Sequence, residues 1–223
     1  MLEKIRLLSP LIPIIFFGIF CRKRTSKELW VFFVYCLASL VVDLFLATSL
    51  WASEHRFAIW NIFAVFEIII LSYFFYLIIH QRVIRIVIIF LAFLYITFYF
   101  FYSKSDNDQY HSTIGVLGSI IILIFTLFYI MNVMKPTLEP ISIFTPAFLI
   151  SIAFLISVSS TLFLNIIANK LTISEMEKYW NISNYSNILM NIIFSSAFVL
   201  FYIQQKSKPP ESHSVDFTSP NDR

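Results

Sequence analysis

Four asparagines lie inside the last apolar stretch of this chain, where a lipid-facing side chain would have no hydrogen-bond partner. Asn184, Asn187, Asn191 and Ser195 are spaced by three, four and four residues, so they share one face of a helix, with Asn181 at its edge. Amide and hydroxyl groups both donate and accept hydrogen bonds. The stripe therefore predicts a polar interior shared with other helices rather than a lipid-exposed surface.

Two carboxylic acids, Asp43 and Glu67, also fall within apolar stretches. A carboxylate near the centre of a membrane helix costs on the order of 2.5–3.5 kcal/mol on insertion scales. We therefore expect both side chains to point into a helix bundle and to supply charge or proton sensitivity there. No lysine or arginine is expected deep enough to neutralise either one, so the expected partners are amides, hydroxyls, His111, water or a ligand.

Other polar side chains fall at a similar depth on other apolar stretches, and together they predict an outward-facing pocket. Tyrosines at helical spacing would line its walls, and this mixture suits a small amphipathic molecule better than a bare ion. The expected ligand-binding set is Asp43, Asn61, Glu67, Tyr95, Tyr99, His111, Asn165, Asn184, Asn187 and Asn191. Neither Cys21 nor Cys36 has the neighbours that a zinc site needs, and we expect no metal and no cofactor.

The composition places these side chains in a membrane protein. The chain has 223 residues, of which 59% are hydrophobic and 13% charged, and its mean hydropathy is +0.81. A soluble domain of this size cannot bury that much apolar surface, and the apolar residues fall in long runs. The expected surroundings are therefore a lipid bilayer. The charged residues cluster in short loops, so nucleic-acid binding is not expected.

Seven apolar segments predict an all-α integral membrane bundle of seven transmembrane helices within residues 1–203, followed by a disordered cytoplasmic tail at 204–223. The first segment is short and contains Pro10 and Pro13. The expected segments are Ile5–Phe20, Leu29–Leu50, Phe57–Ile79, Val83–Tyr102, Tyr110–Met134, Ile143–Ala168 and Trp180–Ile203.

The positions of lysine and arginine predict an orientation, because cytoplasmic loops are enriched in these residues. Nine of them flank one side: Arg22, Lys23, Arg24, Lys27, Arg82, Arg85, Lys135, Lys206 and Lys208. Six flank the other: Lys4, Arg6, Arg56, Lys104, Lys170 and Lys178. We expect the N-terminus outside and the C-terminus inside, with the predicted pocket open to the outside.

The length, the external N-terminus, the basic inner loop "CRKRTSKE" and the outward polar cavity resemble the seven-helix sensory regions associated with bacterial histidine kinases. The stretches "WNIFAVFE" and "SNILMN" are similar to parts of small bacterial seven-helix membrane proteins. This resemblance implies a receptor-like protein of the bacterial inner membrane. Its output would pass to a separate membrane or cytoplasmic signalling protein.

Other functions stay open at this level. A proton-coupled transporter could use Glu67, although three glycines leave little material for broken helices. A lipid-modifying enzyme could use Asp43 or Glu67 as acid or base, and a structural or assembly subunit needs no ligand at all. The chain has no Walker loop and no His-Glu-x-x-His motif, and we favour a binding protein over an enzyme.

Overall fold

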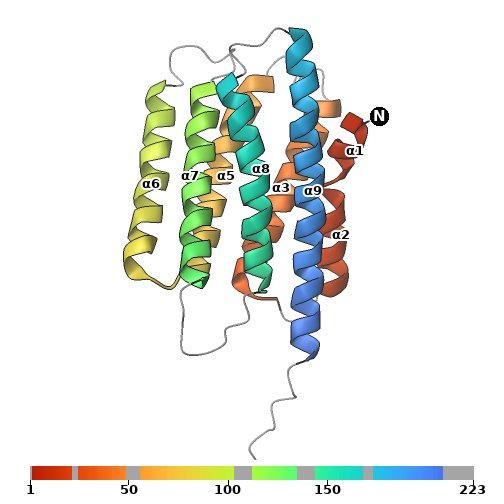
Figure 1. The fold of residues 1–223 in the computed structure, drawn as a ribbon, viewed down its shortest axis with the longest axis vertical. Helices are drawn as coiled ribbons and strands as arrows, with labels where there is room; N and C mark the ends of the chain where they lie inside the picture. The colour runs from red at the N-terminus through yellow and green to blue at the C-terminus, as the bar shows by residue number, and fades with distance from the viewer. Residues whose placement is uncertain are drawn as a thin grey trace, which may run out of the picture.

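The computed structural model describes residues 2–21, 25–48, 56–102, 112–134, 144–167 and 173–207, and throughout these ranges the regular structure is helical. The bounds of the helices, from the N-terminus onward, are α1 (Leu2–Leu8), α2 (Leu11–Phe20), α3 (Lys27–Thr48), α5 (Arg56–Ile78), α6 (Arg82–Tyr102), α7 (Ser112–Val133), α8 (Pro146–Ile167) and α9 (Ile173–Lys206). From α3 onward, successive helices run in opposite directions side by side along the long axis of the molecule (Figure 1).

Six of these helices, α3 and α5–α9, are long and apolar enough to cross a membrane. They coincide with six of the seven expected segments. The expected all-α class is therefore confirmed for the described part of the chain, and the length and composition of these six helices suggest a multi-pass membrane protein.

The remaining expected segment, Ile5–Phe20, is not one continuous helix. It breaks at Ser9 and Pro10 into α1 and α2. Pro10 has no N–H to continue the backbone ladder, and the Ser9 hydroxyl donates to the carbonyl oxygen of Arg6 at 2.7 Å, which satisfies a helix-end acceptor. Pro13 lies in the first turn of α2, where a missing N–H costs nothing.

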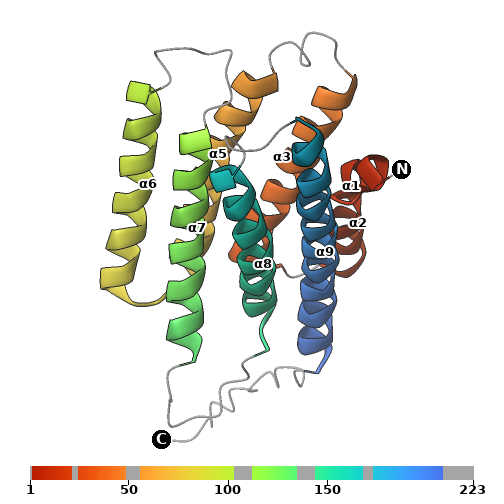
Figure 2. The same ribbon diagram turned by 45° about the horizontal axis from the view of Figure 1, so that its top comes forward.

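The helices form a closed ring with one helix outside it. Going around the ring, α3 packs against α5, α5 against α7, α7 against α8, α8 against α9, and α9 against α2, which returns to α3. Helix α6 contacts only α5 and α7 extensively and lies at the edge of the bundle (Figure 2). Its buried residues are confined to Ile88, Ala92 and Tyr95, a single stripe at helical spacing.

The centre of the ring is filled by aromatic side chains. Phe32 of α3 is fully buried, and its ring centroid lies 4.5 Å from that of Phe194 and 5.9 Å from that of Phe198, both on α9. The Phe74 ring of α5 and the Phe154 ring of α8 complete the contact at 5.9 and 6.2 Å. One side chain thus joins four helices, and edge-to-face contacts of this kind add to the area they bury.

Replacing Phe32 with alanine is expected to lower the free energy of unfolding by about 3–5 kcal/mol, because it leaves a cavity among four other rings. The measurement is unfolding of the purified chain in detergent. Phe93→Ala is the matched control, since that ring is 67% exposed on the outer helix α6. Equal effects of the two substitutions would contradict the central role of Phe32.

Candidate functional site

A cavity of about 300 Å³ lies inside the ring, directly beside the aromatic centre. Its walls come from α1, α3 and α5–α9, and they include apolar side chains such as Phe63, Ile122, Val158 and Met190. The cavity occupies the part of the bundle toward the end that carries the N-terminus, since it uses the first half of α7 and the second half of α6 (Figure 1). Its polar lining is Arg6, Ser9, Tyr35, Ser39, Asp43, Asn61, Glu67, Ser119, Ser157, Thr161, Ser183, Asn187 and Asn191, with Trp60 and Tyr95.

Glu67 of α5 enters the cavity beside Tyr35 of α3. The Tyr35 hydroxyl donates a hydrogen bond of 2.9 Å to Oε1 of Glu67. Tyr35 is itself buried, with 5% of its surface exposed, so the bond holds two neighbouring helices together at the level of the cavity. A single neutral donor satisfies one carboxylate oxygen and leaves the charge of Glu67 without a cationic partner among the described residues.

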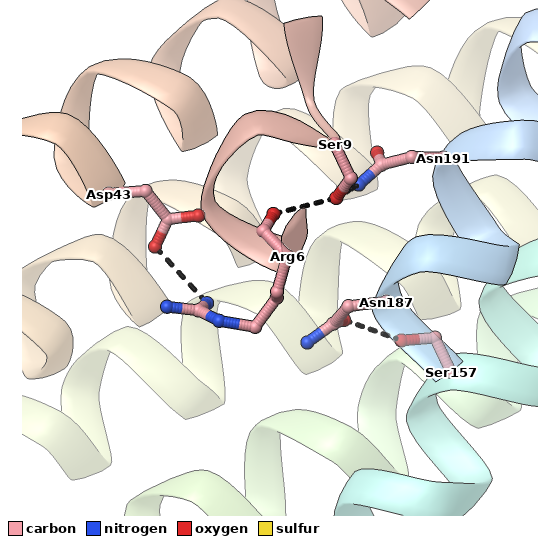
Figure 3. Close-up of polar contacts among 6 residues, drawn as sticks. All are labelled: Arg6, Ser9, Asp43, Ser157, Asn187 and Asn191. Carbon is pink, nitrogen blue, oxygen red and sulfur yellow. Dashed lines mark hydrogen bonds and ion pairs between the residues drawn. The ribbon is translucent and has the colours of Figure 1, made fainter. Parts of the chain in front are cut away.

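Asp43 has the cationic partner that Glu67 lacks. Nη1 of Arg6, on α1, lies 3.4 Å from Oδ1 of Asp43 on α3 (Figure 3). The expectation that no arginine lies deep enough to neutralise a buried carboxylate is therefore wrong for Asp43. Arg6 belongs to α1, the short helix before the break at Ser9 and Pro10, and α1 places it in the cavity lining.

The amides of α9 connect it to two other helices around the cavity. Nδ2 of Asn191 donates to the Ser9 hydroxyl at 2.8 Å, and both residues are buried. The Ser157 hydroxyl of α8 donates to Oδ1 of Asn187 at 3.2 Å. The amide nitrogen of Asn187 points away from Ser157, in the direction of the Arg6 side chain (Figure 3). These asparagines thus both line the cavity and tie helices together.

Of the two other buried asparagines in the expected set, one lines the cavity and one does not. Asn61 of α5 lines the cavity, is 6% exposed and makes no hydrogen bond within the described part of the chain. Asn184 is 4% exposed but does not line the cavity. Its position one turn before Asn187 places it outside the set that the structure brings together.

Only one of the two expected tyrosines of α6 lines the cavity. Tyr95 is 1% exposed and lines the cavity, and its hydroxyl lies against Gly118 of α7, where an added Cβ would come within 3.2 Å of it. A glycine at this position lets the outer helix α6 reach the cavity. Tyr99 is half-buried against the apolar core and does not line the cavity.

The side chains of the other two expected residues lie outside the part of the chain that the structure describes. His111 lies outside the described residues, and Asn165 lies on α8 with its side chain outside the described part. Of the expected set, the structure brings together Asp43, Asn61, Glu67, Tyr95, Asn187 and Asn191.

Arg6, Ser9 and Tyr35 line the cavity but were not among the expected residues. Tyr35 precedes Ser39 and Asp43 at intervals of four, and this spacing was a usable signal. Arg6 and Ser9 had no such signal, because their depth depends on the helix break.

Comparisons with protein-family models, with curated proteins and with solved structures returned no match for this chain. Within the described part of the chain, no group of three or more histidine, cysteine, aspartate or glutamate side chains could hold a metal ion. The arrangement is suited to holding a small molecule by a few polar contacts within apolar walls.

Replacing Arg6 with methionine is expected to destabilise the protein by roughly 1–3 kcal/mol, because the carboxylate of Asp43 then lacks its charge partner. Adding Asp43→Asn to that variant should restore part of the loss, since the uncompensated charge is removed. Unfolding of the two single variants and the double variant in detergent measures the coupling. Strictly additive effects would show that the ion pair contributes nothing to the fold.

Proposed function

We propose that this chain is a receptor-like integral protein of a bacterial inner membrane, which binds a small amphipathic molecule in an outward-facing pocket. Signalling would pass through a separate membrane or cytoplasmic protein. The observation that supports the proposal is the cavity of about 300 Å³, at the lower end of the range for small-molecule sites, with charged, amide and aromatic side chains on one lining.

The aromatic centre favours binding over passage. Phe154 lines the cavity and also contacts Phe32 and Phe194 in the fully buried aromatic layer. A molecule that enters the cavity therefore meets packed rings on its way to the far end of the bundle. A closed floor of this kind suits a receptor that retains its ligand.

The outward direction of the pocket rests on a topology of seven spans, with the N-terminus outside. Basic residues favour it, and so does α2, whose Ile15 and Ile19 are 55% and 63% exposed and would contact lipid. As a straight helix, Ile5–Phe20 would cover about 24 Å at 1.5 Å per residue, which is somewhat less than a hydrocarbon core of about 30 Å. The break at Ser9 would place α1 beside the cavity near the outer boundary.

A proton-coupled transporter is the second candidate, and one observation favours it. Transporter sites are often built at discontinuous helices near the middle of the membrane. The break between α1 and α2 lies beside the cavity. Arg6, which precedes the turn, pairs with Asp43, and Ser9, within the turn, accepts a hydrogen bond from Asn191. Alternating access would require the aromatic layer to open.

The topology predicts that a green fluorescent protein fused after Ser207 fluoresces, whereas alkaline phosphatase at the same site is inactive, because both report a cytoplasmic position. A small epitope tag before Met1 should be accessible to antibody on spheroplasts with an intact inner membrane. An inaccessible N-terminal tag with an unchanged C-terminal result would mean that α1 and α2 do not span.

The pocket predicts that Asn61→Cys and Asn187→Cys, in a chain without Cys21 and Cys36, react with an impermeant thiol reagent added outside. Asn184→Cys is the matched control, because Asn184 lies on the same helix as Asn187, is as buried as Asn61 and does not line the cavity. The cavity positions should react on the order of tenfold faster, since only a hydrated thiolate is reactive.

The side from which labelling occurs separates the candidates. Labelling of Asn187→Cys from the outside alone supports the receptor, whereas labelling also from the inside, in inverted vesicles, supports the transporter. A folded protein with no labelling at either cavity position would contradict both and favour a structural subunit.

A further inference from the structure

The cavity has an unequal charge balance. Its charged lining residues, among those the structure describes, are Arg6, Asp43 and Glu67. Arg6 and Asp43 form an ion pair at 3.4 Å and cancel one another. Glu67 is bound by the neutral hydroxyl of Tyr35, so an ionised Glu67 leaves one negative charge facing the cavity.

The surroundings of Glu67 leave room for a partner. Asn61, Ala64 and Glu67 all line the cavity from one face of α5, and alanine, the smallest of these side chains, separates the other two. Asn61 is 94% buried, as its exposed fraction is 6%, and it makes no hydrogen bond within the described residues. An amide that lines the cavity and is not engaged by another described side chain is available to bond a ligand there.

The walls beside this face are aromatic. Tyr35, Trp60, Phe63, Tyr95 and Phe154 all line the cavity. Aromatic faces attract organic cations through the ring quadrupole, most strongly where water is excluded. An anion would instead meet Glu67 and an arginine whose Nη1 already pairs with Asp43, and a neutral molecule would leave an ionised Glu67 uncompensated.

We propose that the cavity binds a small organic cation, a protonated or quaternary amine on a compact apolar body. Its ammonium group lies between Glu67 and the aromatic walls, within reach of the Asn61 amide. The carboxylate, the amide and the rings form a site for an organic ammonium ion rather than for a bare metal ion, which would need more oxygen ligands. This assignment rests on the proposed binding function and names its ligand class.

Binding of three matched probes to the full chain in lipid nanodiscs tests the assignment by calorimetry. The probes are 2-phenylethylamine, 2-phenylethanol and 3-phenylpropionate, which are cationic, neutral and anionic at pH 7. A parallel set with cyclohexyl bodies separates the effect of charge from that of the ring. The amine is expected to bind on the order of tenfold or more tighter than the alcohol, as a charge-assisted contact would provide, and the anion weakest.

Glu67→Gln should abolish the preference for the amine, since it keeps the shape and removes the charge. The matched control is Glu28→Gln, the same loss of charge at a carboxylate of α3 that does not line the cavity, with Glu67 left in place. That variant should keep the preference. If Glu67→Gln does not fold, Ala64→Leu fills the space beside Glu67, retains its charge and should abolish amine binding.

The outcomes distinguish this assignment from the proposed function. Equal binding of amine and alcohol, or a preference that persists in Glu67→Gln, overturns the cationic ligand while the pocket remains a site for neutral molecules. Preferred binding of the anion overturns it in the same way. Binding of no probe overturns the cationic ligand, and thiol labelling of Asn187→Cys from outside then decides whether the proposed function fails with it.

Discussion

Hydrocarbon offers no hydrogen bonds, and every polar group in this bundle has to be accommodated under that constraint. The helical backbone satisfies its own groups. Many hydroxyls do the same by donating to the carbonyl four residues earlier, as Ser72 does to Ile68, Thr126 to Ile122 and Ser151 to Ala147. Side chains that cannot be satisfied in this way, chiefly the carboxylates and amides, lie mostly around one internal cavity.

The break in the first apolar segment is a second consequence of that constraint. A proline in a membrane helix leaves a carbonyl without its usual donor. Here the Ser9 hydroxyl donates to the carbonyl of Arg6, and Asn191 in turn donates to Ser9. The same turn brings Arg6 to Asp43, so the backbone defect and the buried carboxylate are resolved by one short segment.

The bundle consequently divides into two regions with different roles. The aromatic layer around Phe32 is fully packed and joins α3, α5, α8 and α9. The region above it is held by a small number of polar contacts, such as Tyr35 with Glu67 and Ser157 with Asn187. Polar contacts between membrane helices are individually weak, about 0.6 kcal/mol on average, so this region can exchange some of them for contacts with a ligand.

The sequence by itself determined the class of the protein and the location of its spans. Runs of about 20 apolar residues have one stable solution in a bilayer, the helix. For that reason the ends of six segments could be predicted closely, except that α9 begins at Ile173 and not at Trp180. Helical spacing also predicted the polar stripe on α9, of which Asn187 and Asn191 line the cavity and Asn184 does not.

Only the tertiary structure decided which polar groups meet. Spacing shows which residues share a face, but it does not show which helix that face contacts, because a helix that is apolar on all sides has no strong rotational preference. The pairing of Glu67 with Tyr35 depends on α5 packing against α3, and the pairing of Asp43 with Arg6 depends on the broken first segment. These contacts join residues more than 30 positions apart, and packing between helices rather than local pattern brings them together.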